Sequence, residues 1–425
     1  MKPEHFNPMR IVSLSCVLCG VLACAASGGE EAATAVIRDS AGVTIVENPF
    51  VEPADIGFWH VDSVPALTIG VLDGEPAYEF GSIKSVRQLP NGMIVVLDGR
   101  GESAFEFRFF DSTGKHIATH GRSGMGPGEF RWVNFFGTAG GDTIVAVDFP
   151  ARRISWLSAS LGYLRSSMVD EPRYKQLLGE DVSNIAEGMV PLGDSLYATK
   201  AYRRRADAAT PFGGRFTQYD NVNLAADTTI RIAQYDEGGA FVRLQLSRGI
   251  SNMSTEIETP IGVHVVDRTR RALCAATTRV TQLVCADSRG TRRIVRWTHT
   301  PVEFTADDRR EIEDRIRGAS YYGPGDADKI IAVFVWPTHY NPIRALQIDA
   351  DGNFWILEYM RDEAGTRKLR FRVLNPDGEH IAFATGYETS PYGLNNAIEI
   401  GSNRVLRRIT NADGVEQIAS FTIRK

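Results

Sequence analysis

Short apolar or alternating runs, separated by glycine-containing turns, recur along most of the chain. The first clear set spans residues 82–121 and reads SIKSVRQLPNG, MIVVLDG, AFEFRFFDSTG and KHIATHG, with turn signals at Asn91-Gly92, Asp98-Gly99 and Thr113-Gly114. Such dipeptides between runs of period two are typical of antiparallel β-hairpins. We therefore predict a four-stranded meander in this segment.

The same design returns at intervals of roughly 40 to 60 residues, which is the spacing of repeated sheets. Further sets are predicted at residues 132–168, 185–235, 261–298 and 341–386, and a last set, from residue 395, has only three strand-like runs. No helices alternate with these strands, which favours an all-β fold, a six-bladed β-propeller, over a sandwich or a barrel. The run at 58–70, FWHVDSVPALTIG, is expected to complete the last blade and close the ring.

Two segments depart from this pattern. TADDRREIEDRIRG predicts one charged surface helix, with Thr305 as the N-cap and Gly318 at its end. GRSGMGPGEF, residues 121–130, holds four glycines and a proline, so the backbone is expected to turn at positive φ more than once. A phosphate-binding loop is disfavoured there because the following FRWVNFFG is strand-like rather than helical.

The amino terminus predicts export. An apolar run from Ile11 to Ala23 follows Arg10 and is too short to span a bilayer, which indicates a signal peptide. Val21-Leu22-Ala23-Cys24 resembles the bacterial lipobox, so residues 1–24 are predicted as a lipoprotein signal with Cys24 lipidated, residues 25–40 as a flexible tether, and residues 41–425 as one propeller. The alternative is a plain secretory signal. Ala25 and Ala26 lack the aspartate of inner-membrane retention, which favours the outer membrane, facing the periplasm.

Only two cysteines remain in the folded part. Cys274 and Cys285 lie symmetrically about the centre of RALCAATTRVTQLVCAD, which reads as two strands joined by a tight turn. In an oxidising compartment this placement allows a cross-strand disulfide, and two buried free thiols are the alternative.

The motifs of several sets resemble a known repeat. GRSGMGPGEF with GDTIVAVD and ARRISWL, and DADGNFWILEY with FRVLNPDGEHI, are similar to NHL-type repeats. The whole arrangement resembles the NHL-like six-bladed β-propeller lipoproteins of bacteria, a family of unknown function. The resemblance implies an NHL/TolB-like propeller, typically a binding platform, with related folds that are metal-dependent hydrolases or lactonases.

Candidate chemistry is sparse. The eight histidines show no metal-binding spacing, and DADGNFWILE begins like a calcium loop but fails its spacing at Gly352 and Glu358, so a hairpin turn explains it better. There is no G-x-S-x-G motif. The formal charge of −5 gives no reason to expect nucleic acid as a partner. We expect no cofactor, except a divalent metal if the protein is a hydrolase.

Two surface features are candidates for recognition. VFVWPTHYNP forms a candidate binding loop through Trp336, His339 and Tyr340, with core packing as the alternative. A candidate basic patch in the fourth set consists of Arg268, Arg270, Arg271, Arg292 and Arg293, with a solvated edge as the alternative. The sequence thus favours a monomeric, non-catalytic platform, held to the membrane only by its lipid, that binds an unknown protein or envelope ligand. The alternative is a periplasmic metal-dependent hydrolase or lactonase with its site at the axis.

Overall fold

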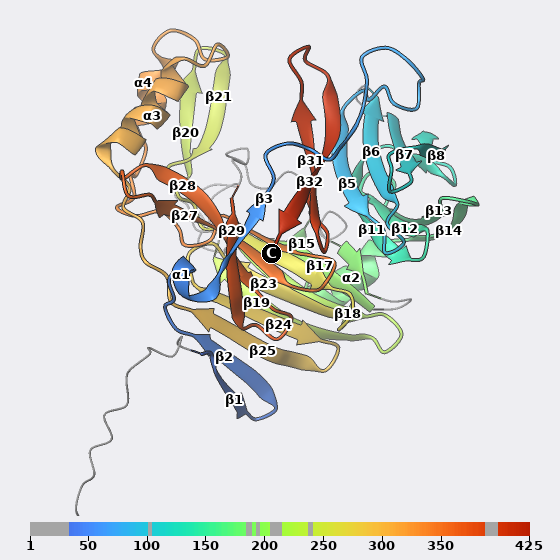
Figure 1. Ribbon diagram of the computed structural model, residues 1–425, viewed down its shortest axis with the longest axis horizontal. Coiled ribbons are helices and arrows are strands. Elements are labelled where there is room, and N and C mark those ends of the chain that lie inside the picture. Colours follow the sequence, from blue (N-terminus) through green and yellow to red (C-terminus); the bar gives the residue numbers. More distant parts are fainter. Residues whose placement is uncertain are drawn as a thin grey trace, which may run out of the picture.

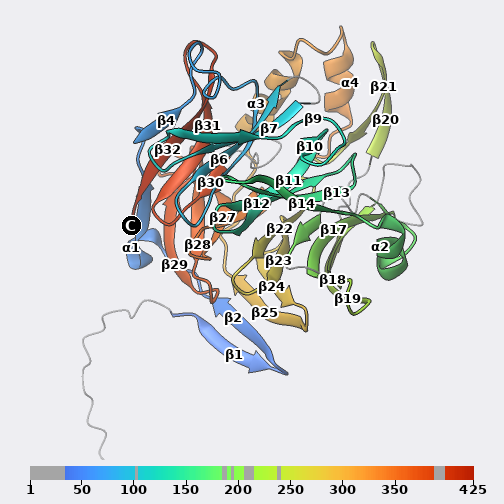
Figure 2. The ribbon, with the colours of Figure 1, turned by 90° about the vertical axis from the view of Figure 1, so that its right-hand side faces the viewer.

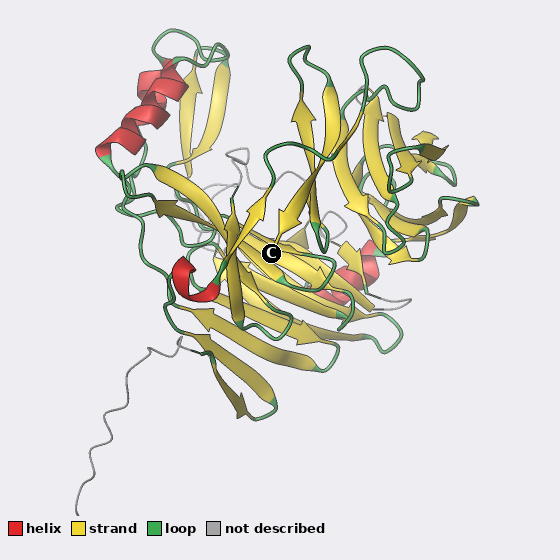
Figure 3. Cartoon of the chain, in the orientation of Figure 1, coloured by secondary structure: helices red, strands yellow, loops and turns green. Residues whose placement is uncertain are grey.

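The computed structural model describes residues 34–100, 104–183, 189–192, 196–204, 215–236, 241–386 and 398–425. Strands dominate these residues, and the helices are few and short (Figure 3). The all-β class predicted from the sequence is therefore confirmed. The predicted signal peptide and Cys24 lie outside the described residues. Within the described ranges, no helix is long and apolar enough to cross a bilayer.

The first two predicted meanders are present as antiparallel sheets. The first sheet consists of β5 (Ile83–Gln88), β6 (Ile94–Arg100), β7 (Ala104–Phe110) and β8 (His116–His120). The second sheet consists of β11 (Val133–Gly140), β12 (Thr143–Asp148), β13 (Arg153–Ser158) and β14 (Gly162–Met168). Between them lie β9 (Arg122–Ser123) and β10 (Glu129–Phe130), which pair in parallel across the glycine stretch.

The predicted turn at Asp98-Gly99 is wrong. β6 continues through both residues and pairs Gly99 with Phe105 of β7. The Asp98 carboxylate is fully buried and lies 2.8 Å from Nη2 of Arg108, so the acid belongs to the sheet interior. The glycine stretch does turn as expected, with Gly121 at φ 96°, Gly124 at 148° and Gly128 at 73°.

The third and fourth sheets carry additions that the pattern did not predict. The third sheet consists of β15 (Val182–Ser183), β16 (Met189–Pro191), β17 (Leu196–Arg204), β18 (Arg215–Asn223) and β19 (Thr228–Asp236), and the helix α2 (Glu171–Leu178) precedes it. The fourth sheet consists of β22 (Gly262–Asp267), β23 (Ala272–Thr277), β24 (Gln282–Asp287) and β25 (Gly290–Trp297).

The amino-terminal hairpin extends the fourth sheet. β2 (Val43–Asn48) pairs in parallel with β25, and β1 (Val36–Ser40) pairs with β2 at the outer edge (Figure 1). Residues 36–40, predicted as part of the tether, therefore form a strand. The sequence also predicts, in the third set, an insertion containing RRRADAATPFGGRF, residues 203–216, of which residues 205–214 lie outside the described residues.

The fifth and sixth sheets are joined by strands from the amino-terminal segment. The fifth consists of β26 (Ala345–Ile348), β27 (Phe354–Arg361), β28 (Arg367–Leu374) and β29 (His380–Thr385); the sixth consists of β30 (Ile398–Ile400), β31 (Arg404–Thr410), β32 (Glu416–Arg424) and β4 (Leu67–Ile69). β4 pairs with β32, opposing Thr68 to Ala419. β3 (Phe58–Val61), which follows α1 (Pro53–Ile56), pairs with both β29 and β32, so the two sheets are continuous.

The hydrophobic core is divided into clusters that lie between consecutive sheets. Phe107 of the first sheet packs edge-on against Phe136 of the second, with ring centroids 5.4 Å apart. Similar clusters join the second sheet to the third, the third to the fourth, the fourth to the fifth and the fifth to the sixth. A further cluster joins Leu406 of the sixth sheet to Ile94 of the first. The packing therefore returns to the sheet where it began.

A lobe stands apart from the six sheets. It consists of the hairpin β20 (Phe241–Leu246) and β21 (Gly249–Ser254) with the helices α3 (Ala306–Arg317) and α4 (Asp326–Ala332), which group at one edge of the molecule in two perpendicular views (Figures 1 and 2). The sequence predicted α3 alone of these elements, and its capping box with Thr305 is present. We call these four elements the lobe.

Candidate functional site

Residues from three sheets approach one side chain of the fourth, Arg268. It follows β22 in the fourth sheet, and its Nη1 donates a hydrogen bond to the carbonyl oxygen of Thr138 in β11 of the second sheet. In the order in which the sheets pack, the third sheet lies between the second and the fourth. The contact of Arg268 with Thr138 therefore bypasses the third sheet. Arg87 of β5 and Glu399 of β30 form an ion pair of 3.4 Å beside it. We call Arg87, Arg268 and Glu399 the axial cluster.

The charges of the axial cluster influence one another. Burial, and after it the charge of Arg87, lowers the pKa of Arg268 to about 10, while the charge of Glu399 acts in the opposite direction. Burial raises the pKa of Glu399, and the charges of Arg87 and Arg268 act against that rise. The three side chains thus place two guanidinium groups and one carboxyl group in the cluster.

Each arginine of the candidate basic patch contacts a carboxylate or a backbone oxygen. Most of its arginines contact a carboxylate: Arg270 reaches Asp267 and Asp377, Arg293 reaches Asp377, and Arg292 reaches Asp287. The remaining two contact backbone oxygens, Arg271 that of Leu192 and Arg268 that of Thr138. These contacts join turns within a sheet and turns of neighbouring sheets. Of the five arginines, only Arg268 belongs to the axial cluster.

The candidate binding loop is divided between core and surface. Tyr340 is buried beside Phe304 and Tyr359, with ring centroids 5.0 and 4.3 Å away. Trp336 is half-buried and packs against Arg309 of α3, whose guanidinium carbon lies 4.6 Å from the ring centroid. His339 is exposed. The aromatic residues thus anchor the base of the lobe rather than forming one open surface, which agrees with the core-packing alternative for Tyr340.

The hairpin of the lobe is tied to its helices by polar contacts. Asp326, the first residue of α4, accepts a hydrogen bond of 2.9 Å from the backbone N–H of Ser247, and Lys329 donates to the carbonyl oxygen of Gln245 at 3.2 Å. Ile250 in β21, Tyr321 between the helices and Val335 after α4 are 54%, 58% and 60% exposed. The lobe therefore presents apolar side chains outside the core.

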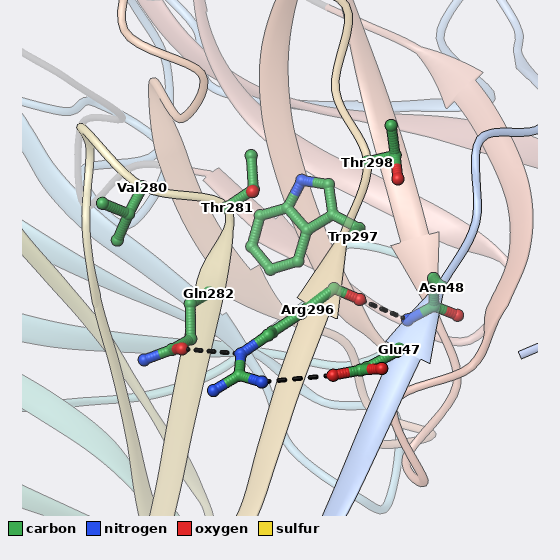
Figure 4. Close-up of a pocket in the computed structure, with 8 residues that line it drawn as sticks. All are labelled: Glu47, Asn48, Val280, Thr281, Gln282, Arg296, Trp297 and Thr298. Atoms are coloured by element: carbon green, nitrogen blue, oxygen red, sulfur yellow. Dashed lines mark hydrogen bonds and ion pairs between the residues drawn. The ribbon is translucent and has the colours of Figure 1, made fainter. Parts of the chain in front are cut away.

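A depression of about 480 Å³ lies where the amino-terminal hairpin joins the fourth sheet (Figure 4). Arg296 crosses its floor, donating through Nε to Gln282 (3.0 Å) and through Nη1 to Glu47 (3.2 Å). Asn48 fixes the adjoining strand by donating to the carbonyl oxygen of Arg296 at 3.1 Å. Arg296 thus pairs with two other lining side chains, whereas the buried Nε1 of Trp297 has no hydrogen-bond partner among the described residues. The axial cluster contributes none of the lining.

The calcium-like segment at Asp349 forms a tight turn, and the same turn geometry occurs at four other positions in the described residues. Five side chains accept hydrogen bonds from the backbone N–H groups two and four residues later, closing tight turns: Asp111, Asp349, Asp362, Asn375 and Asn411. A side-chain oxygen that satisfies the turn in this way is a standard role for Asp and Asn. The hairpin interpretation of this segment explains its spacing without a metal.

No set of metal ligands is found in the part of the chain that the structure describes. There, no three His, Cys, Asp or Glu side chains come close enough together to hold a metal ion. The axial cluster supplies a single carboxylate, where the hydrolase alternative needs several oxygen or nitrogen ligands. The axial residues Arg87 and Glu399 were not predicted from the sequence, because a site assembled from one residue per sheet leaves no local spacing.

Comparison with known proteins leaves the family open. No protein-family model and no curated protein matches the chain. Among solved structures, a putative exported protein from Bacteroides fragilis is 10% identical, with a TM-score of 0.42, and the match covers 90% of this chain and 100% of that one. A DUF4221 member from Bacteroides vulgatus is 12% identical, with a TM-score of 0.47 and coverage of 86% and 99%. These likenesses are too distant to assign an activity, and the NHL resemblance stays a prediction.

Proposed function

We propose that the protein is an exported lipoprotein, anchored through Cys24 to the outer membrane and facing the periplasm, whose six sheets are the blades of a β-propeller of the NHL/TolB type. The cyclic order of the hydrophobic clusters supports the propeller, because each blade buries its faces against its two neighbours. The pairing of β4 with β32 supports closure by an amino-terminal strand.

We infer that this propeller is a binding platform and that its lobe engages a protein partner in the envelope. One observation carries this inference: the lobe contributes nothing to the cyclic packing of the sheets, yet Asp326 joins its hairpin to α4, and Tyr321 and Val335, which flank α4, are exposed. Exposed aromatic and aliphatic side chains on an ordered projection are typical anchors of protein interfaces.

Paired surface variants test the platform. Tyr321→Asp with Val335→Asp charges the residues that flank α4 in the lobe, and Leu161→Asp charges a more exposed turn of the second sheet, where Leu161 is 76% exposed. After crosslinking in the native envelope, we expect the same protein adduct with the wild type and with Leu161→Asp. We expect at least about a tenfold loss with the lobe variant. Equal adduct yields for the wild type, the lobe variant and Leu161→Asp would contradict the inference that the lobe engages the partner.

Anchoring is tested separately. Cys24→Ala removes the thiol that would carry the lipid, so we expect the mature chain to move from the membrane fraction to the soluble periplasmic fraction and to lose incorporation of labelled fatty acid. Retention of both the membrane location and the label in Cys24→Ala would contradict the lipobox.

A further inference from the structure

We propose that the depression where the amino-terminal hairpin joins the fourth sheet is a binding site for a neutral saccharide, whose oxygen accepts a hydrogen bond from the indole nitrogen of Trp297 (Figure 4). The proposal goes beyond the platform function, since it involves neither the lobe nor a protein partner. It depends on an unpaired buried donor, on the fixed strands around it and on the charges of the depression.

The indole of Trp297 carries a donor that the fold leaves unpaired. Its ring belongs to the apolar cluster between the fourth and fifth sheets, and the residue is only 4% exposed. Nε1 is buried and has no hydrogen-bond partner in the part of the chain that the structure describes. Leaving a buried donor unpaired is unfavourable, and native folds rarely do so. An indole nitrogen only donates, so a ligand that pairs with it must offer an acceptor oxygen.

The nitrogen lies among residues that line the depression. Figure 4 places it between Thr281 and Thr298, on the side of the ring away from Arg296. The hydroxyl groups of both threonines make no hydrogen bond to another described residue. A hydroxyl group both donates and accepts, as the hydroxyl groups of a sugar do. The indole and the two threonines therefore offer a sugar three hydrogen-bonding groups that the protein does not use itself.

Backbone hydrogen bonds fix the strands that carry these groups. The N–H of Trp297 donates to the carbonyl oxygen of Thr281 at 3.3 Å, and the N–H of Thr298 donates to that of Asn48 at 3.1 Å. The side chain of Asn48 donates to the carbonyl oxygen of Gly378, in the turn before β29, at 2.9 Å. The walls of the depression are thus held by both the fourth and the fifth sheets, which reduces the entropy that binding costs.

The charges of the depression favour an uncharged ligand. Arg296 and Glu47 form an ion pair of 3.2 Å, and Glu47 also pairs with Arg38 at 3.0 Å. The eight lining residues include no other charged side chain, so an ion finds no unpaired charge there. The volume of about 480 Å³ lies within the range of roughly 300–1,000 Å³ that is usual for small-molecule sites.

A ligand reaches the indole nitrogen from the rim of the depression. Nε1 is covered by its neighbours, so binding requires a rim side chain to rotate. Val280 and Thr298 are exposed, and neither side chain is held by a hydrogen bond within the described residues. Their rotation therefore breaks no such bond. Val280 in addition offers an apolar contact to the ring carbons of a sugar.

Sugar titrations test the site. The probes are glucose, N-acetylglucosamine and the charged sugar glucuronate, each titrated by calorimetry into the purified mature protein at neutral pH. We expect at least one neutral sugar to bind, and glucuronate to bind more weakly because the charges of the site are already paired. In NMR spectra, the bound sugar should shift the indole N–H resonance of Trp297, which is identified by its loss in Trp297→Phe.

Matched variants locate the site. Trp297→Phe removes the indole N–H, and Thr281→Val replaces a hydroxyl with a methyl group; each should weaken binding of the neutral sugar about threefold to tenfold. Trp132→Phe alters a tryptophan that is 50% exposed and lies outside the depression, so it should leave the affinity unchanged. If Trp297→Phe does not fold, Thr281→Val decides the matter.

Three results overturn the proposal: absence of binding by both neutral sugars, tighter binding of glucuronate than of either, or an affinity that both site variants leave unchanged. None of them bears on the crosslinking of the lobe.

Discussion

At the scale of single residues, charged pairs recur at the same position in two sheets. Arg108 of β7 lies opposite Val96, and Arg372 of β28 lies opposite Ile356. The partner acid stands two residues further along the second strand: Asp98 in the first sheet and Glu358 in the fifth. All four charged side chains are at most 1% exposed. Removing one partner of such a buried ion pair leaves an uncompensated charge in the interior and strongly lowers the free energy of unfolding.

The first prediction concerns Glu358. Burial alone raises its pKa, but contact with His299 and the charges of Arg372 and Arg370 outweigh burial and hold the pKa at about 2. Glu358→Gln leaves buried guanidinium groups without their carboxylate and should reduce the free energy of unfolding by about 3–5 kcal/mol in urea titrations. Glu363→Gln, at an exposed turn, should change it little. A loss no larger than that of the control would show that the pair is not stabilising.

The second prediction concerns two histidines that are neutral in the folded protein. Burial, helped by the charge of Lys200, lowers the pKa of His264 to about 3, and burial with the charge of Arg372 does the same for His380. Below a pH of about 6.5 the unfolded chain binds protons that these folded residues do not. Stability is therefore lost as the pH falls from about 6.5 toward 3.

Urea titrations at pH 7 and pH 5 measure this effect. For each histidine, the free energy of unfolding should be about 2 kcal/mol lower at pH 5 than at pH 7. His264→Phe keeps an aromatic ring beside Tyr219, whose centroid lies 5.2 Å away, and removes the titration. The variant should lose about 2 kcal/mol less than the wild type between the two pH values. An identical loss would mean that His264 is protonated in the folded state.

At the scale of elements, local signals and long-range contacts combine. Thr305 is the N-cap of α3, as the sequence predicts, and the structure adds a reciprocal bond from Asp308. Asp308 also forms ion pairs with Arg361 and Arg367 of the fifth sheet. The disulfide joins Cys274 and Cys285, which face each other across β23 and β24. One bond thus fixes the hairpin at the centre of the fourth sheet.

The third prediction follows from this disulfide. The two cysteines are 11 residues apart. A loop of this length should contribute about 2–3 kcal/mol by restricting the unfolded chain. Reduction with dithiothreitol should lower the urea midpoint of the wild type, whereas Cys274→Ala/Cys285→Ala should already be less stable and should not respond. A wild-type midpoint that is indifferent to the reductant would refute this contribution.

At the scale of the whole molecule, the chain ends are interdependent. β4 covers β32, and Ile69 packs with Ile418 in the cluster that joins the sixth sheet to the first. Without β4, that edge of the sheet and this apolar cluster would face water. β1, by contrast, is exposed along its whole length at the outer edge of the fourth sheet.

The fourth prediction uses this contrast. A chain beginning at residue 71 lacks β1, β2, α1, β3 and β4, whereas one beginning at residue 43 lacks only β1 and the segment before it. We expect the longer chain to remain a soluble, cooperatively unfolding species, as judged by size-exclusion chromatography and near-ultraviolet circular dichroism. The shorter chain should aggregate or lose its near-ultraviolet signal. Native behaviour of the shorter chain would show that closure is dispensable.

The strand sets could be predicted because their signals are local. Alternation and glycine turns located the strands of the first, second, fourth and fifth sheets, and Gly92 and Gly114 adopt positive φ where the sequence requires it. The wrong prediction of a turn at Asp98-Gly99 has a non-local cause. That dipeptide is a good turn signal, but the buried contact with Arg108, ten residues later, keeps it in a strand.

The sequence by itself determined the all-β class, the strand sets, the capped helix α3 and the opposition of Cys274 to Cys285, because each depends on residues close together in the chain. The tertiary structure decided the rest: that β2 extends the fourth sheet, that α4 and the β20–β21 hairpin build a lobe, and that Arg87, Arg268 and Glu399 meet. These contacts join residues that are far apart in the chain, and only the packing of whole sheets fixes which of them approach.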